Sequence, residues 1–471
     1  MPGHFIRNLS ASTMQLVTNQ LLGLVIFYLL SNGLGKNEFG ELNWALAILF
    51  TAFNILSFGI DQVIVKKMAA GEDRPKLFSL HLLHVGFTGL LLYGLLAVLS
   101  AVFPGSDKLG LLLFLGLGKL MLFFASPFKQ LAMGQEQFQV LMYLSICANL
   151  CKAAALVWMG FSGEISFFYV LVVFVLAEVA ELALGAWMQR RLLRSSFSFK
   201  ARRTDYAALV KESLPQLGVV LFSSGMARFD WIFIGLFVSA GSLAEYSFAY
   251  KVFEMATLPL LVVAPLLLPL FSRIFRQERQ DLHENLSFLL KLEMIVAPLV
   301  AMVLNLLWTP LIDPLTGGKY GKVNEGTVFI LSLCMPLLYM NNFLWSINFA
   351  RGRTVMIFRS FLVSFLLLVV LDVLLIPLMG NEGAALAYLA AILAQTVIYS
   401  RKTGFAALAK GWQSLLTCSA CALAAGLFAH NFLDHYGAAL ATALGLYFTG
   451  LLLTAQLQPS DWQRFKKAVV R

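Results

Sequence analysis

The stretch "ARFDWIFIGLFVS", from Ala227 to Ser239, sets an arginine and an aspartate two residues apart at the start of an uncharged run. The apolar segment around it is long enough to cross a hydrocarbon core about 30 Å thick. An ionisable side chain at that depth costs roughly 2.5 kcal/mol or more on insertion scales. We therefore expect Arg228 and Asp230 to face a protein interior or a watery cavity.

The composition extends this inference to the whole chain. Of its 471 residues, 59% are hydrophobic and 13% are charged, and the mean hydropathy is +0.79. A soluble domain carries about 25% charged residues. The sequence therefore predicts an all-α polytopic membrane protein. The net charge of +10 does not indicate a nucleic-acid partner, because the positive charges follow the pattern of a membrane topology.

Apolar runs predict about 14 transmembrane helices. They cover residues 13–34, 42–63, 79–103, 109–131, 138–160, 165–188, 212–238, 245–272, 286–310, 326–349, 355–378, 383–401, 412–430 and 436–456. This even number places both termini on one side. The termini and the loops on that side hold 27 of the 35 Lys and Arg residues, Lys129 among them, and the opposite loops hold 4. Because short cytoplasmic loops carry the excess of positive charge, both termini are expected in the cytoplasm.

A weak internal repeat divides the chain. At an offset of 204 residues, Leu29–Ala47 aligns with Phe233–Lys251, at the turn from the first span of each half into the second. The basic segment Gln189–Tyr206 separates the two halves. Many secondary transporters are built from such repeats, with the substrate path between them. We predict a six-helix bundle in 1–200, a second in 201–405, and two added helices with a tail in 406–471.

Three segments resemble the polysaccharide flippases of the multidrug/oligosaccharidyl-lipid/polysaccharide (MOP) superfamily. They are "NEFGELNWALAI" from Asn37, "IGLFVSAGSLAEYSFAYKVFE" from Ile234, and "LPLLVVAPLLLPLFSRIF" from Leu258. The resemblance implies two six-helix bundles facing each other in a V, around a cavity that opens alternately to each side. It also implies a cargo, an undecaprenyl-diphosphate-linked oligosaccharide carried across the bacterial inner membrane for cell-surface or exopolysaccharide synthesis. Related families export drugs by cation coupling or flip the peptidoglycan precursor, and these are the alternative functions.

Polar residues inside the spans are the candidates for cargo binding. Arg228 presents a planar fork that suits a diphosphate, and Asp230 can pair with it when no cargo is bound. Neutral amides suit sugar hydroxyls, and helix packing is the alternative role for these side chains. The candidates for the cavity are Arg228, Asp230, Lys251, Lys119, Gln15 and Asn19.

Three acidic residues are the candidates for coupling to an H⁺ or Na⁺ gradient. Glu178 and Glu181 are three residues apart on one helix face, and two carboxylates so close in low dielectric are not expected to be ionised together. A lateral contact with Lys119 or Lys152 is the alternative. Glu254 is the third candidate, on the same face as Lys251.

The motifs exclude catalysis. The chain has no G-x-x-x-x-G-K-[ST] loop, no constellation of nucleophile and base, and no long loops of the kind that a membrane polymerase needs. His81 and His84 have no carboxylate or cysteine nearby in sequence, which favours an interfacial position. The sequence thus predicts a transporter without a cofactor. Its expected partners are membrane lipids, the lipid-linked cargo, and polysaccharide polymerase and chain-length components.

The predicted topology places Gln189–Tyr206 in the cytoplasm, because this segment is the longest basic connection in the chain. A Ser195→Cys variant, made after replacing the five native cysteines, should react with a membrane-impermeant maleimide only when the cells are opened. Labelling of Ser195→Cys in intact cells would contradict this topology.

Overall fold

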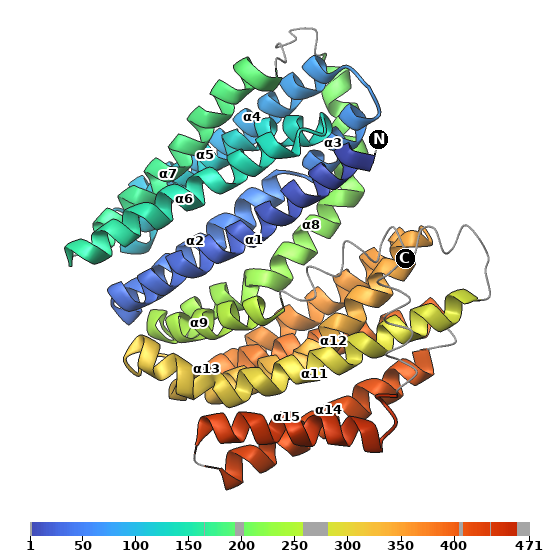
Figure 1. The fold of residues 1–471 in the computed structure, drawn as a ribbon. Coiled ribbons are helices and arrows are strands. Elements are labelled where there is room, and N and C mark those ends of the chain that lie inside the picture. Colours follow the sequence, from blue (N-terminus) through green and yellow to red (C-terminus); the bar gives the residue numbers. More distant parts are fainter. Residues whose placement is uncertain are drawn as a thin grey trace. The chain divides into compact units, whose positions relative to one another are not determined.

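The computed structural model describes residues 2–163, 165–193, 202–257, 281–404, 408–433 and 435–458, and every regular element in these ranges is helical (Figure 1). Twelve of the described helices are long and apolar enough to cross a membrane. This confirms the prediction of an all-α polytopic membrane protein. The third segment of the resemblance, Leu258–Phe275, lies outside the described residues.

Contacts group the chain into two compact units, Met1–Ala244 and Glu245–Arg471. In unit 1, α1 packs on α6, α5 packs on α4 and α7, and α8 packs on α2 and α3. The bundle boundaries predicted at 200 and 405 stay predictions. The helices of unit 1, with the short π-helical turn η1 and α9, which runs on into unit 2, are α1 (Pro2–Gly33), α2 (Lys36–Leu56), α3 (Ile60–Ala69), α4 (Arg74–Val102), α5 (Asp107–Gly134), α6 (Phe138–Ser162), α7 (Phe167–Met188), η1 (Gln189–Leu193), α8 (Arg203–Phe237) and α9 (Ala240–Ala256).

In unit 2, α11 packs against α12, α14 and α15, and α12 packs against α13 (Figure 1). Small residues on α14 and α15 allow these two helices to approach closely. The hydroxyl of Tyr447 on α15 donates to the carbonyl of Ile295 on α11, at 2.7 Å. After α9, the described helices are α11 (Asp281–Thr316), η2 (Lys322–Asn324, a 3-10 turn), α12 (Glu325–Ala350), α13 (Thr354–Thr403), α14 (Leu408–Phe432) and α15 (Tyr436–Leu453).

The twelve candidate spans match thirteen of the fourteen predicted ones. One helix, α13, contains both predicted spans 355–378 and 383–401, which meet at a kink. At that kink Gly380 has a φ of 57° and a ψ of −129°, a conformation that only glycine adopts without strain. The remaining predicted span, 245–272, begins in α9 and continues beyond the described residues.

Two ion pairs connect the start of α8 to α3 and α4. The Lys76 amine lies 2.9 Å from an Asp205 carboxylate oxygen, and the Lys67 amine lies 3.1 Å from Glu212. The hydrogen bond from Lys76 lowers the pKa of Asp205, and the hydrogen bond to Glu212 raises the pKa of Lys67. This part of α8 precedes the apolar span that starts at Gln216, so the contacts lie outside the membrane-spanning segment.

These shifts predict that the attachment of α8 is pH-dependent at both extremes. The Asp205 contribution exists above the ordinary aspartate pKa and is lost as pH falls through the lowered value. The Lys67 contribution exists below the ordinary lysine pKa and is lost as pH rises through the raised value. Amide-exchange protection of residues 203–212, corrected for intrinsic exchange, should therefore fall in acid. In a Lys76→Gln variant this acid dependence should be reduced; an unchanged dependence would contradict the role of the Lys76–Asp205 pair.

Candidate polar site in the first unit

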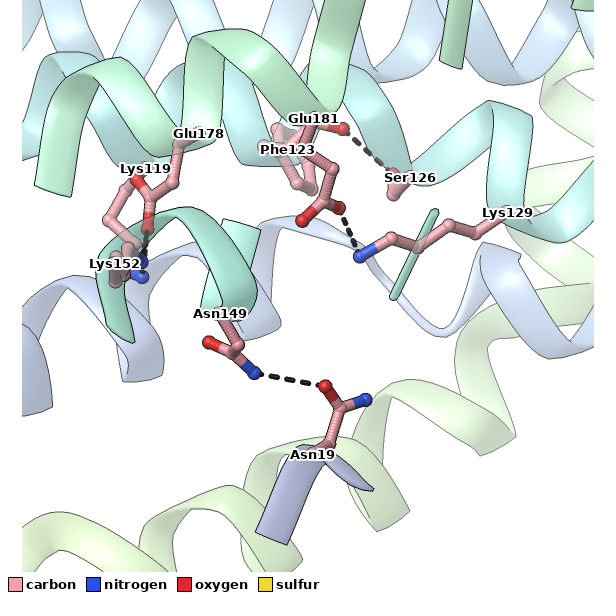
Figure 2. A network of polar contacts seen from close by, with 9 residues as sticks. All are labelled: Asn19, Lys119, Phe123, Ser126, Lys129, Asn149, Lys152, Glu178 and Glu181. Atoms are coloured by element: carbon pink, nitrogen blue, oxygen red, sulfur yellow. Dashed lines mark hydrogen bonds and ion pairs between the residues drawn. The ribbon is translucent and has the colours of Figure 1, made fainter. Parts of the chain in front are cut away.

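Two lysines share one carboxylate inside unit 1. The Glu178 Oε1 atom on α7 accepts from the Lys119 amine of α5 at 2.8 Å and from the Lys152 amine of α6 at 3.0 Å (Figure 2). The side chain of Glu178 is 2% exposed, that of Lys152 is 8% exposed and that of Lys119 is 19% exposed. The Lys152 amine also lies 4.6 Å from the ring centroid of Phe174. Three helices thus meet at one carboxylate, and Lys119 is its most accessible partner.

Glu181 forms a separate ion pair. Its carboxylate contacts the Lys129 amine of α5, one helical turn along α7 from Glu178 (Figure 2). Lys129 lies inside α5, so its assignment to a connecting loop was wrong. Glu178 and Glu181 contact different lysines. For Glu178, the structure shows the lateral contact with Lys119 and Lys152 that was the alternative to a coupling role. A coupling role for the two acids stays a prediction.

A glycine makes room for the Glu178 carboxylate. A Cβ atom at Gly118 of α5 would lie 2.7 Å from Glu178 Oε2 and 3.1 Å from the Cα atom of Val175. Both distances are shorter than van der Waals contact, so the absence of a side chain at Gly118 lets α5 approach α7 at this point. The sequence analysis did not single out Gly118, because the glycine acts through a residue sixty positions away.

An amide pair joins α1 to α6 beside this cluster. The Asn149 side-chain nitrogen donates to Asn19 Oδ1 at 3.1 Å (Figure 2). The predicted cavity residue Gln15 lies one turn before Asn19 on α1 and is partly exposed. The structure therefore brings Asn19 against α6, the helix that carries Lys152. Its contact with Asn149 is of the kind that supports helix packing, and a role in sugar binding stays a prediction.

Arg228 and Asp230 contact their own helix. The Arg228 Nη1 atom donates to the Ala227 carbonyl at 2.7 Å, and the guanidinium carbon lies 4.4 Å from the ring centroid of Trp231. The Asp230 side chain is fully buried, and its Oδ1 atom accepts from the Trp231 backbone N–H at 2.8 Å. A guanidinium stacked on an aromatic ring keeps its donors directed outward around its edge. The predicted role of the two residues in cargo binding stays a prediction.

The predicted pair on α9 is formed. The Lys251 amine lies 2.8 Å from Glu254 Oε2, and both side chains are partly exposed. This pair belongs to unit 2, whereas the cluster on α5, α6 and α7 belongs to unit 1. It confirms that Lys251 and Glu254 share one face of their helix.

Sequence reasoning missed the partners of two histidines. His81 is 1% exposed, and its Nε2 atom lies 2.8 Å from Asp61 Oδ1. His84 is 2% exposed and contacts the Leu56 carbonyl through Nε2 and the Tyr206 hydroxyl through Nδ1. Because a carbonyl only accepts, Nε2 carries the proton. A carboxylate that is distant in sequence, Asp61, thus lies against His81, and the expected interfacial position of the two histidines stays a prediction.

The clearance at Gly118 predicts a stability difference between two glycines of the same helix. Gly118→Ala should displace the Glu178 carboxylate from the two lysines and lower the melting temperature in detergent. Gly110→Ala is the matched control, because a Cβ there meets nothing within 4 Å. Alanine is favoured over glycine in a helix by about 1 kcal/mol, so the control should be neutral or stabilising. Equal melting temperatures for the two variants would contradict the packing role of Gly118.

Comparisons with known proteins show the family to which this chain belongs. The model of a family described as "polysaccharide biosynthesis protein" matches residues 5–275, more than half of the chain. The search of curated proteins gave no significant match.

Several solved structures share the fold. A lipid II flippase, MurJ, in an inward closed conformation superimposes with a TM-score of 0.76 at 15% identity, over 98% of this chain and 99% of that one. An inward-facing MATE-family multidrug transporter of the MOP superfamily gives 0.67 at 12% identity, over 86% and 99%. A MOP superfamily transporter from Pyrococcus furiosus gives 0.56 at 11% identity, over 88% and 96%.

The family match agrees with the resemblance inferred from the quoted segments, and at these identities the structural matches establish the fold. The solved structures that share this fold are those of transport proteins. The chain is a multi-pass membrane protein of the polysaccharide biosynthesis family, with the fold of the MOP superfamily.

Proposed function

We propose that this protein carries an undecaprenyl-diphosphate-linked oligosaccharide from the cytoplasmic to the outer leaflet of the bacterial inner membrane by alternating access. The termini would lie in the cytoplasm, and the polymerase and chain-length components would act on the delivered cargo. The family supports the class of cargo. The observation that carries the proposal is the surplus of cations over acids around Glu178.

The cluster in unit 1 suits an anion. It contains the three lysines Lys119, Lys129 and Lys152 and the two acids Glu178 and Glu181, so the basic groups outnumber the acidic groups by one. Inside a membrane protein such a surplus is costly unless an anion neutralises it. The diphosphate of a lipid-linked sugar is doubly anionic, and it can take over the lysine that Glu178 holds in its absence. Lys119 would make this exchange first, because its side chain is the more exposed of the two.

Arg228 supplies the second contact in this proposal. A guanidinium binds two phosphate oxygens at once, which an ammonium does not. Between transport cycles, Asp230 would compensate the charge of Arg228, and Glu254 would compensate the charge of Lys251. The amides of Gln15 and Asn19 would contact sugar hydroxyls. Coupling to an H⁺ or Na⁺ gradient through Glu178, Glu181 or Glu254 completes the proposed cycle.

The test is the transfer of a fluorescent undecaprenyl-diphosphate oligosaccharide across the membrane of proteoliposomes. Loss of a charge-assisted hydrogen bond costs about 1.5–3 kcal/mol, which lowers affinity roughly 10- to 100-fold. A Lys119→Gln, Lys152→Gln double variant should therefore lose transfer at low cargo concentration. Lys322→Gln is the control, because Lys322 is an exposed lysine outside this cluster. Arg228→Lys should retain part of the transfer that Arg228→Ala loses.

The alternatives give different results in the same vesicles. Transfer of lipid II in preference to the oligosaccharide would indicate the peptidoglycan precursor as cargo. Efflux of a cationic dye without lipid transfer would indicate a drug exporter. Normal transfer by both the Lys119→Gln, Lys152→Gln variant and an Arg228→Ala, Asp230→Ala variant would refute the proposed binding residues, and their charges would then serve packing alone.

A further inference from the structure

Glu293 on α11 differs from the acids with lysine partners. It is 7% exposed, and both of its carboxylate oxygens are buried without a hydrogen-bond partner among the described residues. In contrast, Glu178 contacts two lysines, and Glu181 and Glu254 contact one each. Glu293 is therefore shielded from water, and none of the described residues places a positive charge against its carboxylate.

Among the described residues, no cation contacts the Glu293 carboxylate. The nearest basic residue in sequence, Lys291, is two residues away and lies near the Cys418 thiol of α14. Residues two apart do not share a helix face. The charged or titratable residues on α12, α14 and α15 are Glu325, Cys334, Tyr339, Lys410, Cys418, Cys421, His430, Tyr436 and Tyr447. The two of these that are cationic or can become so are Lys410, which is exposed, and His430, which lines a cavity. The Tyr447 hydroxyl donates to the Ile295 carbonyl.

One backbone hydrogen bond of α11 is missing close to Glu293. Pro298 has no N–H, so the carbonyl of Met294 lacks its helical hydrogen-bond donor. Helices bend at such positions. A bend here would change how the face that carries Glu293 packs against its neighbours.

A cavity begins at the same proline. Its volume is about 670 Å³, and it lies between α11, α12, α14 and α15. Polar groups occur along its length: Asn305 donates to Ser332 at 2.7 Å, and Thr309 donates to Glu325 at 2.7 Å. A cavity with polar groups holds water more readily than an apolar one. Water in this cavity would reach to within about two turns of Glu293 along α11.

We propose that Glu293 is a proton-binding site of the transport cycle, reached by water through this cavity when α11 bends at Pro298. In the packing described, the carboxyl group is the neutral acid, because an ionised carboxylate without a counter-charge is strongly disfavoured inside a membrane bundle. One oxygen forms an O–H bond with a proton taken from hydronium, which leaves as water. When the transporter opens to the opposite side of the membrane, the O–H bond breaks and the proton passes to water on that side. The link to cargo movement rests on the proposed function.

The first test needs no cargo. Purified protein in lipid should show, at neutral pH, the infrared C=O band of a neutral carboxyl group that is missing from Glu293→Gln. This band should shift in D₂O, because the proton exchanges with water. Glutamine resembles the neutral acid in shape and charge, so Glu293→Gln should keep the melting temperature of the wild type. Glu382→Gln, which replaces an exposed glutamate of the same unit, is the control and should keep the band.

The second test uses the oligosaccharide vesicles with and without an imposed pH gradient. Glu293→Gln should lose the stimulation by the gradient and keep transfer down the cargo gradient. Absence of the infrared band, or a band that never exchanges in D₂O, would overturn the proposal, as would stimulation equal to that of the wild type. Absence of cargo transfer by the wild type would instead refute the proposed function, while the infrared result would still decide whether Glu293 exchanges a proton.

Discussion

The low dielectric of the membrane interior constrains every charged side chain in this protein. An ion inside a bundle needs an opposite charge, a hydrogen-bond network or water, because otherwise its insertion is too costly. Glu178 meets this requirement with two lysines from two other helices. The contact ties α5, α6 and α7 to a single carboxylate, and Gly118 provides the space that the carboxylate needs.

The same constraint separates structural from functional charges. A buried ion pair is not by itself evidence of stability, since well-packed apolar residues often do as well. Binding of a ligand therefore explains charges inside a membrane bundle better than a contribution to stability does. Around Glu178 the cations outnumber the acids, which favours an anionic ligand. Around Glu293 no cation is in contact among the described residues, which favours a proton.

The sequence predicted the spans well because each is a local property of some twenty apolar residues. Thirteen of the predicted helices are present in the described ranges, and Lys251 pairs with Glu254, which their position on one helix face allowed. Contacts between helices were harder to predict, because they depend on the rotation of each helix about its axis. Lys129 was counted with the cytoplasmic loops, although it lies inside α5 against Glu181. The Asp61–His81 contact crosses the turn between α3 and α4, where Gly71 has a φ of 88°. In the candidate site, the lysine contact of Glu178 was one of two alternatives, whereas the contact of Glu181 with Lys129 and the clearance at Gly118 were not predicted.

The central claim is that the lysines around Glu178 bind the diphosphate of the cargo. The most direct measurement is native mass spectrometry of the purified protein with undecaprenyl diphosphate and undecaprenyl monophosphate, compared with the Lys119→Gln, Lys152→Gln variant. The wild type should prefer the diphosphate, and the variant should lose this preference while it still binds the monophosphate lipid. An equal preference in the two proteins would contradict the account.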